Sequence, residues 1–498
     1  MLRSLFGGFL NQIFQAAFSF IYYKMTLKIQ LIRKYNMKQL LTVLTLTLTA
    51  CAAVPNAPQD MANIPVPNAW QHASLSDKTI DKLPNRWWEA FDDKELNRLI
   101  DTALQQNSSL QKAALSLQQS LLQVDMATAD MLPSVSASAN ASRRKPLDGS
   151  SQVSKSYSSN AGVSWQLDLF GKLLKSRDVA KYTAQATAEE KQKIALAVTT
   201  QVAESYWELG SLNQKIALSE QNLAATEKLT DIVRIKYKNG AASEMDLLSA
   251  ERSLRQQQSS MAALRHQHNQ TRNALAVLIG EMPETAINEP QTLPQPFRLP
   301  ELKVEMPADV LDNRPDVRAA RLNLMADMAS VDMRVRDFFP SFGLNLGVSA
   351  GGSELSKIVA DPIGSLALNM ALPFLNFPDN VLNLKVSQVK YQSDLAGYRN
   401  TLYTALSEVE NAASQYRQLT EQNSLLNKNL QTTRRLEKMR EVRYHNGADD
   451  LQKLLDAQSD TRSAELSVVE NELALYKNFL TRYTALGGQD VLLNNSQN

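Results

Sequence analysis

The chain repeats one turn motif at two positions that lie 207 residues apart. YKNGAASEMDLLSA at 237–250 and YHNGADDLQKLLDA at 444–457 are identical at seven of their fourteen positions. The same offset relates NSSLQKA at 107–113 to RPDVRAA at 314–320. Agreement at one spacing over so much of the chain indicates a tandem structural duplication. A repeat of this length predicts two copies of a whole multi-helix unit, since solenoid repeats are far shorter.

Each copy of the turn carries the sequence signal of a helix end. The signal is a tyrosine followed two positions later by Asn-Gly, at Tyr237, Asn239 and Gly240 and again at Tyr444, Asn446 and Gly447. Glycine accepts the left-handed conformation that ends many helices. Ser243 in the first copy, and Asp449 or Asp450 in the second, can cap the returning helix. Each repeat is therefore predicted to contain a helical hairpin whose tip is this turn.

Apolar residues recur every seven positions on both sides of the turns. These heptads run through 202–223, 247–275 and 395–416, and they predict helices that wrap around their neighbours. The stretch from Lys172 to Tyr237 has no proline and one glycine. At about 1.5 Å per residue it could reach roughly 100 Å. This length favours a duct that crosses a periplasm, and a dimeric coiled-coil rod is the alternative.

Four stretches alternate apolar with small polar residues at a period of two. They cover residues 134–141, 160–170, 342–350 and 365–372, which gives one strand hairpin per repeat. Such alternation predicts strands between two different environments, and lengths near ten residues suit tilted transmembrane strands. A small soluble sheet is the alternative. Four strands alone would leave unpaired edges in a bilayer, so the membrane interpretation requires strands from several copies.

The region before residue 52 has the pattern of an export signal. A charged start at Met37 precedes the apolar segment Leu40–Ala50, which is too short to span a bilayer. Leu48–Cys51 is similar to a bacterial lipobox, so Cys51 is predicted to be lipidated and to become the mature N-terminus. An ordinary signal peptide with an incidental cysteine is the alternative. Ala52 after the cysteine favours the outer membrane of a Gram-negative bacterium.

Residues 1–36 precede this signal and are basic and aromatic. They are an over-long gene start or an extended n-region, which leaves Met1, Met25 or Met37 as the translation start. These inferences give a domain plan: signal peptide with extended N-terminus 1–50, lipidated tether 51–85, first repeat 86–290 with strand hairpin 134–170, inter-repeat linker 291–306, second repeat 307–488 with strand hairpin 341–372, and tail 489–498.

The composition argues against several classes of function. The net charge of +2 gives no basic excess for nucleic acid. Four histidines and one cysteine leave little for a metal site, and His266 and His268 point to different faces of their helix. No nucleophile–base pattern or phosphate-binding glycine loop is present in the sequence. We expect no catalytic residue, no cofactor and no metal.

The sequence closely resembles the TolC-like outer-membrane efflux channels, in particular their lipidated NodT-type branch. The segments that carry the resemblance are 87–113, 165–172, 313–341 and both tip turns. The resemblance implies a mainly α fold with transmembrane β. Three chains would share one 12-stranded β-barrel, four strands from each, above a periplasmic barrel of long helices. It also implies that residues 282–308 lie in an equatorial belt.

The resemblance further implies the outer-membrane channel of a tripartite efflux pump, without enzymatic activity. Such a channel is a passive exit duct for drugs, dyes and other toxic small molecules. Its expected partners are two further copies, outer-membrane lipid, a periplasmic adaptor and an inner-membrane pump of RND or ABC type. The alternatives are the outer-membrane duct of a type I protein secretion system, and a structural coiled-coil lipoprotein without a pore.

Channels of this family close at their helical tips, with aspartate rings and tyrosine-centred contacts. Carried over by position, Asp246 and Asp456 are the candidate ring aspartates and Tyr444 is the candidate tyrosine. Three copies would turn each carboxylate into a ring, which favours cations at a constriction.

Two tip positions depart from the family pattern. Lys453 stands where the inner aspartate often lies, and Asp449 stands where an arginine can occur. This puts the usual gate salt bridge in doubt and suggests a reversed pairing of Asp449 or Asp456 with Lys453. Helix capping and compensation of the helix dipole are the alternative role for four aspartates, Asp246, Asp449, Asp450 and Asp456.

Overall fold

A computed structural model gives the structure of part of the chain. It describes residues 67, 69–71, 85–147, 153–283, 285–294, 299–300, 302, 307–488 and 492. The chain divides into two units, Met1–Ala57 and Pro58–Asn498, and every described residue belongs to the second unit. The expected signal peptide, the lipidation site Cys51 and nearly all of the tether and the C-terminal tail lie outside the described residues.

The second unit contains two runs of elements in the same order. The first run is α3 (Lys94–Gln106), α4 (Ser108–Ala129), β1 (Ser134–Arg144), β2 (Ser154–Leu167), α5 (Lys172–Lys238) and α6 (Glu244–Leu278). The second run is α7 (Pro307–Asn313), α8 (Pro315–Arg336), β3 (Ser341–Gly352), β4 (Ile363–Ala371), α9 (Phe377–His445) and α10 (Leu451–Ala485). Across the described ranges, no helix combines the length and the apolar character needed to cross a membrane.

The internal duplication is visible in the element bounds. Adding 207 to both ends of α4 gives both ends of α8, and adding it to α6 gives α10. The long helices α5 and α9 each lead into an Asn-Gly turn, and a second helix returns from it. The heptad positions predicted these helices because their residues are buried or half-buried between neighbours, as Val202, Leu275 and Val409 are.

The four strands form one antiparallel sheet in the order β1-β2-β3-β4, so β1 and β4 are its edges. The register places Val135, Val163, Leu346 and Leu366 in one row across the sheet. The next row is Ser136, Gly162, Gly347 and Ser365. Successive side chains of a strand point to opposite faces, so one face is apolar and the other is small and polar. The four predicted strands are confirmed.

The first strand hairpin is longer than the alternation predicted. The predicted strands end at residue 141 and resume at residue 160, but β1 continues to Arg144 and β2 begins at Ser154. The added pairs join Ser142 to Ser156, Arg143 to Lys155 and Arg144 to Ser154. These residues are polar on both faces, so they lack the period-two signal although the backbone ladder continues through them.

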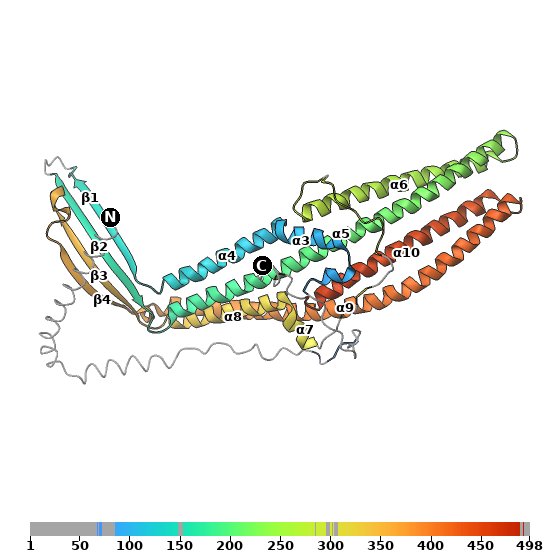
Figure 1. The fold of residues 1–498 in the computed structure, drawn as a ribbon. Helices are drawn as coiled ribbons and strands as arrows, with labels where there is room; N and C mark the ends of the chain where they lie inside the picture. The colour runs from blue at the N-terminus through green and yellow to red at the C-terminus, as the bar shows by residue number, and fades with distance from the viewer. Residues whose placement is uncertain are drawn as a thin grey trace. The chain divides into compact units, whose positions relative to one another are not determined.

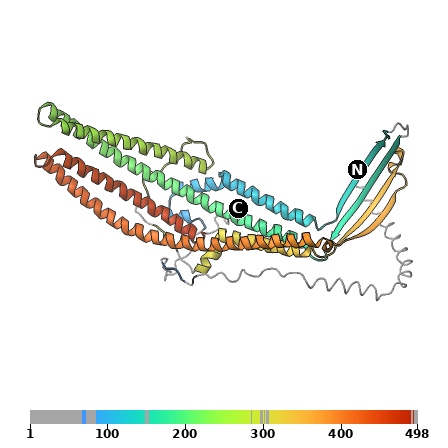
Figure 2. The ribbon, with the colours of Figure 1, turned by 180° about the vertical axis from the view of Figure 1, so that it is seen from behind.

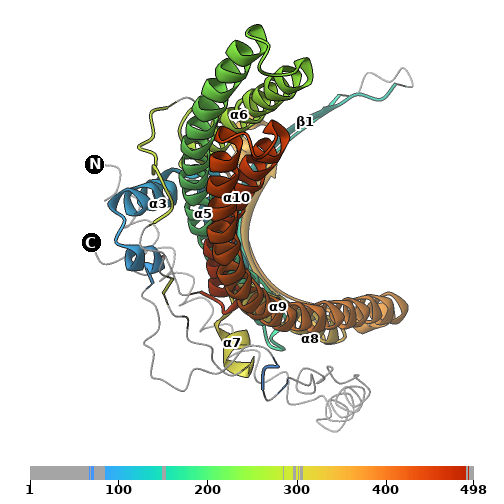
Figure 3. The ribbon, with the colours of Figure 1, turned by 90° about the vertical axis from the view of Figure 1, so that its right-hand side faces the viewer.

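The sheet and the two helix tips lie at opposite ends of this unit (Figure 1). The view from behind shows α4, α5, α8 and α9 running from the sheet towards the middle, where α6 and α10 begin to pair with α5 and α9 (Figure 2). Seen end-on, α5, α10 and α9 follow one curved layer instead of closing into a bundle (Figure 3). The layer keeps the neighbours α4–α5, α5–α8 and α8–α9 in contact.

The largest apolar core lies where α3, α5 and α10 meet. Trp87, Trp88 and Trp207 are fully buried there with Tyr476 and Phe479. Most of the unit is instead stabilised by contacts between neighbouring helices. The consequence is that the tips depend on small local clusters and not on one central core.

Candidate functional site

The first helix tip ends with two hydrogen bonds that fix its turn. The Gly240 N–H donates to the Tyr237 carbonyl, and the Ala241 N–H donates to the Lys236 carbonyl. Gly240 has φ 71°, in the region where an L side chain would be strained. This is the six-to-one and five-to-two bonding of a Schellman motif, and it explains why Asn-Gly ends the helix here.

The second tip repeats this geometry. The Gly447 N–H donates to the Tyr444 carbonyl, the Ala448 N–H donates to the Arg443 carbonyl, and Gly447 has φ 72°. The repeated Asn-Gly turn therefore builds two helix ends of the same geometry, and both lie at the same end of the unit (Figure 1).

The two returning helices begin with different caps. Ser243 accepts from the Asp246 N–H while the Asp246 carboxylate accepts from the Ser243 N–H, which is a complete capping box. Asp450 accepts from the Lys453 N–H at 2.9 Å, and this bond lowers the pKa of Asp450. In this structure Asp246 and Asp450 thus make the capping contacts that the sequence suggested.

Asp449 is the most enclosed carboxylate of the two tips. Its side chain is 3% exposed and accepts from Arg443 at 2.8 Å and Arg440 at 2.9 Å. These two guanidinium groups lower the pKa of Asp449 to about 2. Lys453 lies farther away, at 3.7 Å. The expected Asp449–Lys453 pair is therefore present, but it is longer than the two arginine contacts. Asp449 mainly links the end of α9 to the turn that follows it.

Asp456 does not pair with Lys453 in this structure. It is exposed, and it accepts from the Gln452 side chain at 2.7 Å. Lys453 instead lies 3.4 Å from Asp450. The Asp456 carboxylate is thus exposed to solvent and has one uncharged partner, Gln452.

The two tips touch each other through an apolar cluster. Leu451, Leu454 and Leu455 of α10 pack against Leu229, Val233 and Ala250 of the first hairpin. Tyr444 packs beside this cluster, and the Lys236 ammonium lies 4.7 Å from its ring centre. The cluster therefore joins two hairpins that are far apart in the chain.

Sequence reasoning missed Arg440, Arg443 and Lys236 as tip residues. Lys236 and Arg443 are cations in the last turns of α5 and α9, where positive charge is favoured, and Arg440 lies one turn earlier in α9. That signal could have found them, but it would not have identified Asp449 or Tyr444 as their partners. Among the described residues, no group of three or more His, Cys, Asp or Glu side chains could hold a metal ion.

A sequence model of the outer membrane efflux protein family matches residues 99–281 and 306–488. The chain belongs to the outer membrane efflux protein family. The two matched ranges correspond to the two structural repeats. Both tip turns, at 237–250 and 444–457, lie within the matched ranges of this efflux protein.

Relatives of this efflux protein match it along nearly all of their length. The pyoverdine export outer membrane protein OpmQ of Pseudomonas putida is 26% identical over 459 residues, which cover 90% of this chain and 97% of OpmQ. The cation efflux system protein CusC of Escherichia coli K12 is 25% identical over 453 residues, which cover 89% of this chain and 97% of CusC.

A solved structure supports the fold of this efflux protein. The open-state outer membrane channel MtrE of Neisseria gonorrhoeae is similar with a TM-score of 0.76 at 27% identity, over 87% of this chain and 98% of MtrE. The TolC-like fold expected from the resemblance is confirmed.

Proposed function

We propose that this efflux protein is the outer-membrane duct of a tripartite export system for small molecules. The observation that carries the proposal is the sheet, which presents an exposed apolar face at the end of long helical hairpins. The helices extend the duct into the periplasm, and the two tips form its inner end. A periplasmic adaptor and an inner-membrane pump would dock there, and the chain itself catalyses no step.

The apolar face of the sheet is as tall as the apolar band of an outer-membrane barrel. From Leu167 to Tyr157 the strand β2 covers about 33 Å at about 3.3 Å per residue. A tilt of about 40° reduces this to about 25 Å, the apolar height of outer-membrane barrels. Trp165 and Tyr157 lie near the two ends of this face, where aromatic residues meet the membrane interfaces.

The open sheet edges support assembly from several copies. β1 and β4 each have one unpaired side, and unpaired backbone groups are costly in hydrocarbon. Three copies would supply twelve strands, above the minimum of about eight for a membrane barrel. The helices that flank the helical layer, α4 and α9, expose apolar side chains at Leu121, Leu122, Val386 and Val389. These would pack between neighbouring copies.

The tips are the proposed gate. In a trimer each of Asp246 and Asp456 would form a ring of three carboxylates, which favours cations at the constriction. Opening would separate the hairpins at the apolar cluster between α10 and the first hairpin. Asp449, Asp450 and Lys453 would hold the second turn in shape, while Tyr444 with Lys236 would link the two tips.

Planar-bilayer recording with native mass measurement tests the function. Wild-type protein from outer membranes is expected to be a lipidated trimer with a small, cation-preferring conductance. A monomer without conductance would contradict the duct and would leave a periplasmic coiled-coil lipoprotein. Loss of the palmitate-bearing N-terminal peptide in Cys51→Ser, measured by mass spectrometry, tests the lipid anchor separately.

Three tip variants separate a gate role from a capping role. Asp246→Asn and Asp456→Asn remove ring charge and are expected to raise the open-state leak and weaken the cation preference. Ser243→Ala breaks the capping box without changing any charge, and it should cost about 1 kcal/mol of helix stability. If Ser243→Ala raises the leak as much as Asp246→Asn does while Asp456→Asn changes nothing, the gate assignment is wrong.

A further inference from the structure

Two positively charged side chains lie at the outer end of the apolar face of the first strand hairpin. Arg143 lies directly opposite Lys155, two positions beyond the pair Ala141–Tyr157. Because side chains alternate along a strand, both cations point to the same side as Ala141 and Tyr157. Neither cation has an ion pair with another residue in the described part of the chain. Like charges directly opposite each other destabilise a sheet, so this pair favours an anion between or above it.

We call the outer end of this face, with Arg143 and Lys155, the rim. A third cation lies at the rim and comes from the loop between β3 and β4. The short 3-10 helix Leu355–Ile358 folds back over the apolar face, where Ser159 donates a hydrogen bond to the Ile358 carbonyl. Gly352, opposite Tyr157, has no side chain, and a Cβ there would lie 2.9 Å from the Cβ of Lys357. Lys357 therefore lies against the rim beside Tyr157, and it too has no ion pair with a described residue.

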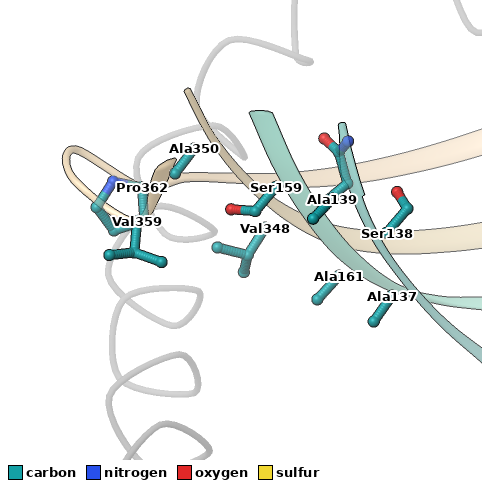
Figure 4. Close-up of a pocket in the computed structure, with 10 residues that line it drawn as sticks. Ala137, Ser138, Ala139, Ser159, Ala161, Val348, Ala350, Val359 and Pro362 are labelled. Atoms are coloured by element: carbon teal, nitrogen blue, oxygen red, sulfur yellow. The ribbon is translucent and has the colours of Figure 1, made fainter. Parts of the chain in front are cut away.

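An apolar hollow lies on the same face, directly below this rim. It has a volume of about 460 Å³ and is lined mainly by Ala137, Ala139, Ala161, Val348, Val359 and Pro362 (Figure 4). The small alanine side chains leave the space, and Val359 and Pro362 of the loop form its other side (Figure 4). Ala139 is four residues from Arg143, or about 13 Å along the strand.

We propose that this rim and hollow bind one phosphate-bearing lipid of the outer leaflet on each chain. The lipid phosphate contacts Arg143, Lys155 and Lys357, and one acyl chain enters the hollow past Tyr157. The site rests on the proposed function, because only insertion of the sheet places the rim at head-group level and the hollow at acyl-chain level. A free phosphate ion would use the three cations but would leave the apolar hollow without a role.

The chain offers a matched control for the cations. Arg144 lies at the same height as Arg143, but it points to the opposite, polar face of the sheet. Arg144→Gln therefore removes one positive charge from the same rim without touching the proposed site. The hollow can be filled separately with Ala139→Leu, which leaves all three cations in place.

The experiment is native mass spectrometry of the delipidated full-length protein. The probes are dipalmitoyl phosphatidic acid, dipalmitoyl glycerol with the same chains but no phosphate, and inorganic phosphate as a competitor. Each cation near anionic lipid contributes about fivefold in affinity, so Arg143→Gln with Lys155→Gln should weaken phosphatidic acid binding about thirtyfold. Lys357→Gln should weaken it about fivefold, Ala139→Leu should also weaken it, and Arg144→Gln should not.

Three results would overturn the lipid site. They are equal binding of phosphatidic acid and dipalmitoyl glycerol, equal losses in Arg143→Gln and Arg144→Gln, and full competition by inorganic phosphate at the lipid's concentration. Measuring the bilayer conductance of the same preparation distinguishes failure of the lipid site from failure of the proposed duct. A conducting trimer that does not distinguish these lipids refutes only the lipid site, whereas a preparation that neither conducts nor binds lipid refutes the proposed function as well.

Discussion

At the residue scale, the two tip glycines are constrained by backbone conformation alone. Gly240 and Gly447 have positive φ, and no atom lies within 4 Å of where a Cβ would stand. Backbone strain alone therefore decides the cost of placing a side chain at either position. We expect Gly240→Ala and Gly447→Ala each to cost about 1–2 kcal/mol, measured by thermal unfolding. Gly397→Ala is the matched control. It lies in open space inside α9, where alanine should stabilise by about 1 kcal/mol. Destabilisation of all three variants alike would contradict this account.

Asp449 and Asp450 are adjacent but are expected to respond differently to neutralisation. Asp449→Asn removes the anion that holds Arg440 and Arg443, so hydrogen exchange should become faster across the second tip. Asp450→Asn should have little effect, because asparagine caps helices as well as aspartate does. The pKa of Asp449 is lowered to about 2, so its contribution is present above about pH 4 and is lost as the pH falls towards 2. Faster exchange in Asp450→Asn alone would refute this assignment.

At the element scale, a carboxyl pair between α8 and α9 makes helix packing sensitive to pH. Asp327 is nearly buried, and Lys390 donates to it and, at 2.9 Å, to Asp394. Burial and the neighbouring Asp394 raise the pKa of Asp327 to about 6. The folded protein therefore holds this proton more tightly than the unfolded chain, and stability falls as the pH rises from about 4 to about 6.

Replacement of Asp327 tests this pH dependence. Asp327→Asn keeps the shape but cannot titrate, so the loss of about 1–3 kcal/mol between pH 4 and pH 6 should disappear. The measurement is the melting temperature as a function of pH. Asp231→Asn, which removes an exposed carboxylate paired with Arg234, is the control and should keep the wild-type slope. An unchanged slope in Asp327→Asn would show that another group titrates in this window.

The elements also differ in how far their sequence predicted them. The helix Lys172–Lys238 was predictable because the heptads at 202–223 lie within a stretch, Lys172 to Tyr237, that contains no proline. The outer end of the first strand hairpin was not, because Arg143, Arg144 and Lys155 look like loop residues. Backbone pairing with the neighbouring strand places them in the sheet, and no local pattern records that pairing.

At the scale of the whole molecule, the two sheet edges should meet between copies. We expect a cysteine at Ser365 on β4 to form an interchain disulfide with a cysteine at one of Ser134, Ser136, Ser138 or Ser142 on β1. A scan of these positions is needed because tilted barrel strands are staggered in register. Non-reducing gels should show dimers and trimers for one pairing. Asn160→Cys on the central strand β2 is the control and should give none, and cross-linking there or nowhere would contradict a shared sheet.

The sequence alone determined the features that depend on local periodicity. The offset repeat, the heptads and the strand alternation each report a helix or strand through its own side chains. The two Asn-Gly turns likewise reported the tips, because a left-handed residue is required wherever a Schellman motif ends a helix.

The tertiary structure alone decided which distant residues meet. The partnership of Asp449 with Arg440 and Arg443, the contact of Tyr444 with Lys236, and the rim of Arg143, Lys155 and Lys357 follow from how hairpins and strands pack. Such contacts depend on the register between segments that are separated in the chain, and one-residue shifts would change every partner. That register is set by packing and backbone pairing, which no single stretch of sequence specifies.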